Sequence, residues 1–208
     1  MNEAKTMSNE EIDMKVYELS LIGEEQLKSM YSVYVIVLKY KNKKYFYIGQ
    51  TGCKSHKIAR PPFLRLAGHL GKQESSMQNQ IYKGIMEKVL KIEYDEDTYR
   101  KVESCLSKMH LTMYTFPIED FKYDIDDDKH KENRQKMEEI EKILIIEFKK
   151  EYDEANILNI KSGKIKDNSK IDKINKAVED IKRYIFAKEP KKTAPQNAGL
   201  HQPKKNAR

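Results

Sequence analysis

The pattern of apolar and polar positions predicts a β-hairpin early in the chain. Residues 33–40 form an almost continuous run of β-branched and aromatic side chains, which is typical of a buried strand. The polar stretch 41–44 contains an asparagine and indicates a turn, after which residues 45–48 resume the strand.

This hairpin relates two tyrosines to each other. If Tyr40 pairs with Tyr45 across the turn, Tyr34 and Tyr47 lie on the same face, because side chains alternate along a strand with a period of two. The sequence leaves the register itself open.

Helical periodicity predicts most of the remaining elements. Ser8 and Glu11 fit a capping box at the start of a helical extension. Pro61-Pro62 suits the start of a helix that carries Arg65 and His69, four residues apart and therefore on one side. The other expected elements are a helix over 77–92, a strand over 111–116 ended by Pro117, a helix over 132–150 and a last helix over 166–187.

The distribution of charge points to a polyanionic partner. Between Gln26 and Gln73 the chain has ten Lys and Arg residues and no Asp or Glu. A segment without carboxylates does not repel a polyanion, so we expect the hairpin within it to face a phosphate backbone. The expected DNA-binding residues are Lys54, Lys57, Arg60 and Lys72.

Glu141 falls inside the apolar stripe of the helix over 132–150. The residues of that stripe are Met137, Ile140, Leu144, Ile145 and Phe148. A carboxylate there costs free energy unless it is paired, protonated or bound to a metal ion. Glu138, at the edge of the stripe, is the competing candidate. The acidic run 126–128 is better explained as a cap of this helix than as a metal site.

Three short motifs together resemble the GIY-YIG nuclease family. They are Ser32-Val33-Tyr34, Tyr47-Ile48-Gly49-Gln50-Thr51 and Arg65-x-x-x-His69. Ser32-Val33 departs from the family's Gly-Ile, but the tyrosine is kept. The resemblance covers roughly residues 31–165. It implies an α+β fold, with a small three-stranded antiparallel sheet flanked by helices, and hydrolysis of DNA phosphodiesters with one divalent metal ion.

The resemblance also implies catalytic roles for four of these residues. Either Tyr34 or Tyr47 is the general base, and we favour Tyr34, with Tyr47 positioning water and phosphate. Arg65 is expected to hold the scissile phosphate, and His69 to accept or relay the tyrosine proton. A tyrosine with its ordinary pKa of about 10 is a poor base, so we expect nearby positive charge to lower that pKa. The commoner fate of a strand tyrosine is burial with a satisfied hydroxyl.

Two further residues match the family pattern. Glu141 is expected to hold one Mg²⁺ ion, or another divalent cation such as Mn²⁺, since these ions take oxygen ligands. Asn159, in the run Ile157-Leu158-Asn159-Ile160, is expected to close the active site, with Asn156 as the weaker alternative.

Length and composition limit the other possibilities. The 208 residues fit one domain over 31–165 with appendages: the helical extension 1–30, the helix 166–187 and a disordered basic tail over 188–208, which carries +5 of the net charge of +7. No run of 18 apolar residues predicts a membrane span, and two cysteines fit a reducing, cytoplasmic setting. A zinc site on the cysteines is disfavoured by loose ligand spacing.

The preferred hypothesis is therefore a sequence-specific, restriction-type DNA endonuclease. Cutting both strands of a palindrome needs two active sites, so such an enzyme would act as a homodimer. The alternatives are a repair or mobile-element nuclease that nicks one strand, and a non-catalytic DNA-binding module that keeps the fold. The matching site residues argue against the last, and nothing in the sequence separates the first two.

Overall fold

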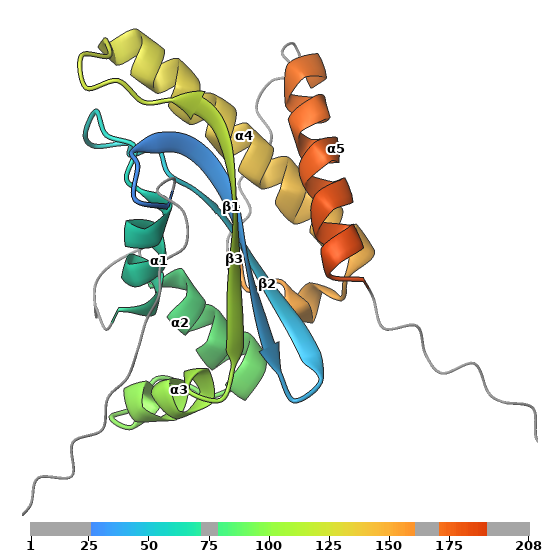
Figure 1. The fold of residues 1–208 in the computed structure, drawn as a ribbon. Helices are drawn as coiled ribbons and strands as arrows, with labels where there is room; N and C mark the ends of the chain where they lie inside the picture. The colour runs from blue at the N-terminus through green and yellow to red at the C-terminus, as the bar shows by residue number, and fades with distance from the viewer. Residues whose placement is uncertain (1–25, 72–78, 161–170, 191–208) are drawn as a thin grey trace, which may run out of the picture.

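The structure, a computed structural model, describes residues 26–71, 79–160 and 171–190. An antiparallel sheet with strand order β2-β1-β3 has helices on both faces, which confirms the expected α+β class (Figure 1). In chain order the elements are β1 (Met30–Tyr40), β2 (Lys43–Gln50), α1 (Pro62–Leu70), α2 (Gln80–Gly84), the π-helix η2 (Ile85–Leu90), α3 (Thr98–Leu106), β3 (His110–Asp120), α4 (Asp127–Glu151), the 3₁₀ turn η3 (Glu154–Asn156) and α5 (Ile171–Lys188).

The β1–β2 turn is tighter than the sequence indicated. Lys41 and Asn42 alone connect the strands, with φ angles of 45° and 63°, so both adopt the left-handed conformation of a type I′ turn. Tyr40 therefore pairs with Lys43, and the assumed pairing with Tyr45 is wrong by two residues. Because side chains alternate with a period of two, this shift leaves the predicted faces unchanged.

The two faces of the sheet bury different sets of strand residues. Even-numbered residues of β1, including Tyr34, Ile36 and Leu38, pack in one cluster with residues of α2, η2 and α3. Odd-numbered residues, including Val33 and Val35, pack against α4 and α5 on the other face. Figure 1 shows these two helical layers on opposite sides of the strands.

β3 does not end at Pro117 as the sequence suggested. It runs to Asp120, and Pro117 pairs with Ser32 next to a register shift between Tyr31 and Ser32. In the described residues β3 pairs with β1 alone, so it is an edge strand. A proline without an N–H is tolerated on an edge and beside a bulge.

Helix boundaries follow the local chemistry. α1 begins at Pro62, which has a φ suited to the first turn. Asp126 caps α4 by accepting a hydrogen bond from Lys129 N at 2.7 Å, in agreement with the interpretation of the acidic run as a cap. In the helix expected over 77–92, the described residues form α2 followed directly by η2, so the second half is a π-helix.

Glu189 anchors the end of α5 to the sheet. Its buried carboxylate lies 3.0 Å from Nζ of both Lys39 and Lys44, and its backbone carbonyl accepts a hydrogen bond from the Tyr152 hydroxyl at 2.7 Å. α5 ends at Lys188, one residue later than expected, and Glu189 extends the folded part into the start of the expected tail.

Several predicted features lie outside the described residues. These are the extension before Gln26, Lys72, the tail after Pro190, residues 77–78 and 166–170 of the two expected helices, and residues 161–165 of the expected domain. None of the helices in the described ranges has the length and apolar character that crossing a bilayer requires.

Candidate active site

Tyr34 and Tyr47 lie side by side on the face of the sheet covered by α2, η2 and α3. Tyr34 sits opposite Gly49 and Tyr47 opposite Ile36, and the two tyrosine ring centroids are 6.4 Å apart. Both side chains are buried. The common face predicted from alternation is therefore present, and it brings two phenol hydroxyls into one cluster.

α1 delivers His69 to these tyrosines. The Tyr34 hydroxyl oxygen lies 2.7 Å from His69 Nε2, and the His69 and Tyr47 ring centroids are 4.6 Å apart. The buried positions of α1 are Pro62 and His69. The helix therefore uses a polar ring as part of its packing surface, as a site residue would.

Arg65, one turn before His69, completes the cluster. It hydrogen-bonds the Tyr34 hydroxyl and interacts electrostatically with Tyr47 and Glu141. Its Nε is buried and has no hydrogen-bond partner among the described residues. A buried cationic donor without a partner is costly, and an anion bound at this position would relieve that cost.

Burial keeps both tyrosines protonated. It raises the pKa of Tyr34 to about 12, with Arg65 opposing the shift and Glu141 adding to it. It raises the pKa of Tyr47 well above 10, and the neighbouring Tyr34 and Glu141 increase it further. Arg65 lowers the pKa of both tyrosines, as expected, but desolvation by the protein outweighs this effect. Tyr34 can therefore accept a proton only while giving its own away, and His69 is in contact to take it.

α4 supplies the carboxylate of the cluster. All five apolar residues of its predicted stripe are buried, and Glu141 is partly buried within that stripe. Burial raises the pKa of Glu141 to about 7, with Arg65 opposing and Glu138 adding to the shift. Glu138 forms an ion pair with Arg134, one turn earlier on the helix. Because Glu138 is already paired, Glu141 fits the expected metal-binding role better than Glu138 does.

The Glu141 carboxylate is a ligand of the kind that a hard divalent cation accepts. Mg²⁺ is usually bound by one or two carboxylates, together with waters and substrate phosphates. The described residues contain no cluster of three or more His, Cys, Asp or Glu side chains that would hold a metal alone. An ion held by one carboxylate would keep several waters, which is the usual state of protein-bound Mg²⁺.

Asn159 binds the backbone of β2 at Ile48, the residue between Tyr47 and Gly49. Its Oδ1 accepts a hydrogen bond from Ile48 N at 2.9 Å, and its Nδ2 donates to Ile48 O at 2.7 Å. The buried amide thus takes the place of a neighbouring strand beside β2. Asn156 lies in the η3 turn and makes no such contact with β2 in the described structure. Asn159 is therefore fixed against Ile48, between Tyr47 and Gly49.

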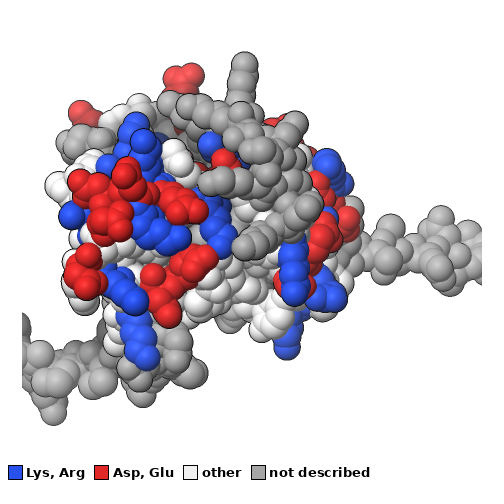
Figure 2. All heavy atoms as spheres, turned by 90° about the horizontal axis from the view of Figure 1, so that it is seen from above, with Lys and Arg blue, Asp and Glu red and all other residues white. Residues whose placement is uncertain are grey.

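The basic loop between β2 and α1 is less purely cationic in space than in sequence. Lys54 and Lys57 are exposed and Arg60 is partly buried. Lys57 Nζ lies 3.1 Å from the carboxylate of Asp127, at the start of α4. Figure 2 views the molecule from the end where this loop and the start of α4 lie, and Lys and Arg side chains there are interspersed with Asp and Glu. The fold therefore brings acids to a segment that has none of its own.

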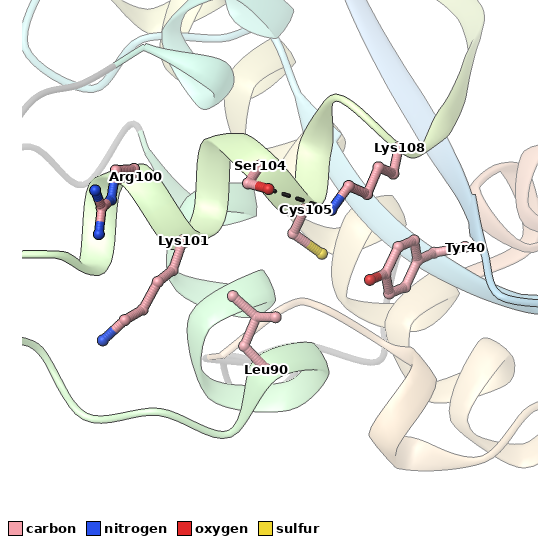
Figure 3. Close-up of a pocket in the computed structure, with 7 residues that line it drawn as sticks. All are labelled: Tyr40, Leu90, Arg100, Lys101, Ser104, Cys105 and Lys108. Atoms are coloured by element: carbon pink, nitrogen blue, oxygen red, sulfur yellow. Dashed lines mark hydrogen bonds between the residues drawn. The ribbon is translucent and has the colours of Figure 1, made fainter.

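A separate cavity of about 480 Å³ lies away from the tyrosine cluster (Figure 3). Its lining residues are Tyr40, Leu90, Arg100, Lys101, Ser104, Cys105 and Lys108. Arg100 and Lys101 are already paired with Asp97 and Asp95, at 3.2 and 2.6 Å. None of its lining residues is Tyr34, Tyr47, Arg65, His69 or Glu141, so this cavity is not the candidate active site.

Thr51 has a structural role that the sequence did not indicate. Its Oγ1 accepts a hydrogen bond from Ser32 N at 2.9 Å and donates to Met30 O. These bonds join the end of β2 to the start of β1, next to Tyr34. Periodicity cannot reveal such a contact, because a single hydroxyl at a strand end carries no repeating signal.

Comparison of the chain with protein-family models, curated proteins and solved structures finds no match. The features that bear on function are therefore the geometry of the cluster formed by Tyr34, Tyr47, Arg65, His69 and Glu141 and the motif resemblance.

Proposed function

We propose that this chain is a metal-dependent DNA endonuclease, similar to the GIY-YIG nucleases, with Tyr34 as general base. The observation that carries the proposal is the 2.7 Å contact between the Tyr34 hydroxyl and His69 Nε2, made beside Arg65 and Glu141. A tyrosine–histidine contact alone is not diagnostic, because Tyr31 makes one with His130 on the opposite face of the sheet. The adjoining cation and carboxylate distinguish the Tyr34 cluster.

The proton path follows from the pKa of Tyr34. The attacking water gives a proton to the Tyr34 oxygen as that oxygen passes its own proton to His69 Nε2. In the neutral tautomer with its hydrogen on Nδ1, the histidine accepts at Nε2. The water oxygen forms a bond to phosphorus, the bond to the leaving oxygen breaks, and that oxygen takes a proton from water. The phenol is neutral before and after the transfer, so its pKa of about 12 is no obstacle.

Arg65 supplies the charge that a phosphodiester needs. The unpaired Nε lies in the same cluster as the Tyr34 hydroxyl, and a planar guanidinium can bind two phosphate oxygens at once. Stabilising the negative charge that develops on those oxygens is usually the largest contribution to such a reaction. Tyr47, whose hydroxyl is more strongly kept neutral, would orient the water and the phosphate.

Glu141 would hold the divalent cation. When bound, Mg²⁺ or Mn²⁺ would neutralise phosphate charge and assist the leaving oxygen. A pKa of about 7 means that Glu141 can switch between protonated and ionised forms near neutral pH, and a neighbouring cation would favour the ionised form.

Plasmid cleavage tests the proposal. The purified full chain is incubated with supercoiled plasmid in Mg²⁺ or in excess chelator, and the ends of the products are sequenced. Discrete linear fragments that depend on Mg²⁺ support a sequence-specific, restriction-type enzyme, and light scattering on DNA then tests for a homodimer. Nicked circles support the repair or mobile-element alternative. DNA binding without any cleavage supports the non-catalytic alternative. If the protein neither binds nor cleaves DNA, the proposal is overturned.

A further inference from the structure

The segment around Asn159 behaves as a short strand on the outer edge of β2. Ile157 forms a parallel bridge with Phe46, and Leu158 N donates to Phe46 O at 2.7 Å. The Asn159 side chain continues the ladder through its two hydrogen bonds to Ile48. The position of this segment therefore sets the position of Ile48, between Tyr47 and Gly49.

Two residues of the α2–η2 helix hold this segment from the other side. Lys88 Nζ donates to Ile157 O at 2.6 Å and to Asn159 O at 3.3 Å. Gly84 lies so close to Leu158 that a Cβ at position 84 would stand 2.8 Å from both the Leu158 Cβ and its carbonyl oxygen. The segment is thus fixed between β2 and η2. Lys88 donates to the carbonyl oxygens of Ile157 and Asn159, which do not bond to β2 in the described structure.

Lys88 acts as a hydrogen-bond donor to the backbone and not as half of an ion pair with this segment. Its partners are backbone carbonyls, and its ammonium is partly buried. Burial lowers the pKa of Lys88, the nearby Lys149 lowers it further, and Glu154 and Glu87 oppose the change. Lys149 is itself paired with Glu154. A partly desolvated ammonium is a costly way to hold a loop unless the loop's position matters.

The helix type is consistent with such a role. η2 is a π-helix of six residues, and π-turns are rare and frequently found at functional sites. Lys88 lies within this turn and reaches across to residues almost seventy positions further along the chain. No periodic pattern in the sequence marks it, because it occupies an ordinary polar position on an amphipathic helix.

We infer that Lys88 is a positioning residue of the proposed active site. It fixes the segment Ile157 to Asn159, and through Asn159 and Ile48 it sets the relative positions of Tyr47 and of Gly49 beneath Tyr34. This inference rests on the proposed function for its catalytic consequence, but not for its structural one.

The test compares Lys88→Met, Lys88→Arg and the matched control Lys101→Met in the full chain. Lys101 is an exposed helix lysine paired with Asp95, so its loss removes one charge without touching the segment. Lys88→Met is expected to lower kcat for DNA cleavage by about 10- to 100-fold with KM changed less than twofold, since small displacements of reacting groups are that costly. Lys88→Arg, which keeps two donors, should recover most of kcat, and Lys101→Met should leave it unchanged.

Hydrogen exchange gives a readout that does not depend on cleavage. The amides of Ile48 and Leu158 should exchange at least tenfold faster in Lys88→Met than in the wild type, while amides in β3 keep their rates. The double variant Lys88→Met/Asn159→Ala should be no slower in cleavage than Asn159→Ala alone, because both act through Ile48. If Lys88→Met does not fold, Lys88→Gln takes its place.

The outcomes separate the two proposals. Unchanged exchange at Ile48 and Leu158, or wild-type kcat in Lys88→Met, overturns the inference. Equal losses of kcat in Lys88→Met and Lys101→Met overturn it as well, since a general charge effect would then explain both. If the wild type cleaves no DNA, the proposed function fails, and faster exchange at Ile48 still supports the positioning role of Lys88.

Discussion

The Tyr34 hydroxyl occupies the space that a side chain at Gly49 would need. A Cβ built on Gly49 would stand 2.4 Å from the Tyr34 hydroxyl oxygen and 2.5 Å from its ring carbon Cζ. The two residues are direct partners across β1 and β2. The glycine is therefore required by the close approach of a buried ring, and the tyrosine is held where it contacts His69.

Replacing this glycine should damage the site more than the fold. Gly49→Ala forces the Tyr34 ring away from β2, which we expect to cost about 1–3 kcal/mol of stability, as overpacked cores do. The hydrogen bond to His69 should be lost with it, and cleavage should fall at least 100-fold. Urea unfolding and plasmid cleavage measure the two effects. Wild-type cleavage in Gly49→Ala would show that the ring position does not matter.

Tyr34 has an internal control in Tyr31. Both are fully buried residues of β1 whose hydroxyls contact a histidine, but on opposite faces of the sheet. Tyr31→Phe should cost about 1 kcal/mol through one lost hydrogen bond, and Tyr34→Phe more than that, because it removes a partner of both His69 and Arg65. Only Tyr34→Phe should reduce cleavage, by about 100-fold or more, since it removes the general base. Both variants should bind DNA as the wild type does.

Comparison with Tyr47→Phe then assigns the two tyrosine roles. If Tyr34→Phe cuts at the wild-type rate while Tyr47→Phe is inactive, the base is Tyr47. Equal losses in Tyr31→Phe and Tyr34→Phe would indicate that the effect comes from stability alone.

The sequence predicts the faces of this sheet better than its pairing. Alternation alone places Tyr34 and Tyr47 together, because a shift of two residues does not exchange the faces. The register depends on left-handed conformations at Lys41 and Asn42, and a lysine there gives no warning of one. Similarly, Pro117 reads as a strand end unless the edge position of β3 is known.

For the candidate site, the sequence likewise predicts which residues take part but not their surroundings. The motif resemblance identifies Arg65, His69, Glu141 and Asn159 as site residues, and the fold brings them near the tyrosines. What the sequence cannot supply is the environment. Desolvation that raises the pKa of Tyr34 depends on packing, and the contact of Lys57 with Asp127 joins residues seventy positions apart.

The Asn159 amide should not tolerate its closest isostere. Asn159→Asp keeps the shape of the side chain but cannot donate to Ile48 O, and its charge would face that carbonyl. We expect a loss of about 1–3 kcal/mol in stability from the unsatisfied group, with cleavage reduced at least tenfold. Thermal unfolding and cleavage assays measure both. Asn156→Asp, three residues earlier in the η3 turn, serves as the control and should leave both unchanged.

DNA binding by the basic loop should depend on Lys54 more than on Lys57. Lys57 is already paired with Asp127, while Lys54 is exposed. Each phosphate contact that is lost lowers the slope of log affinity against log salt by about 0.9, so Lys54→Ala should give a change near that size and Lys57→Ala a smaller one. Asp127→Asn should tighten binding, since it releases Lys57.

Fluorescence anisotropy with a DNA duplex over a series of salt concentrations measures these slopes. Lys182→Ala, which removes an α5 lysine paired with Glu147 and Glu179, is the control. If Lys54→Ala, Lys57→Ala and Lys182→Ala all share the wild-type slope, the loop does not contact the phosphates.

The contribution of Glu141 to the free energy of unfolding should depend on pH. Its folded-state pKa of about 7 lies above the ordinary value of 4.5, so the folded protein holds this proton more tightly than the unfolded chain. The free energy of unfolding is therefore unaffected by Glu141 below pH 4.5 and falls as the pH rises to about 7. The full loss is about 3 kcal/mol, at 1.36 kcal/mol for each pKa unit. Glu141→Gln cannot ionise, so its stability relative to the wild type should rise by that amount between pH 4.5 and pH 8.

If Glu141 is its ligand, Mg²⁺ should reverse the difference in stability between Glu141→Gln and the wild type. At pH 8 the ion should raise the melting temperature of the wild type and of Glu138→Gln, which has its charge paired with Arg134 in the wild type. It should not raise that of Glu141→Gln, which should also fail to cleave DNA. A buried ion-pair role for Glu141 gives the opposite result, because orphaning its partner Arg65 would destabilise Glu141→Gln by about 3–5 kcal/mol at pH 8. Retained cleavage together with such a loss would transfer the metal-binding role to Glu138.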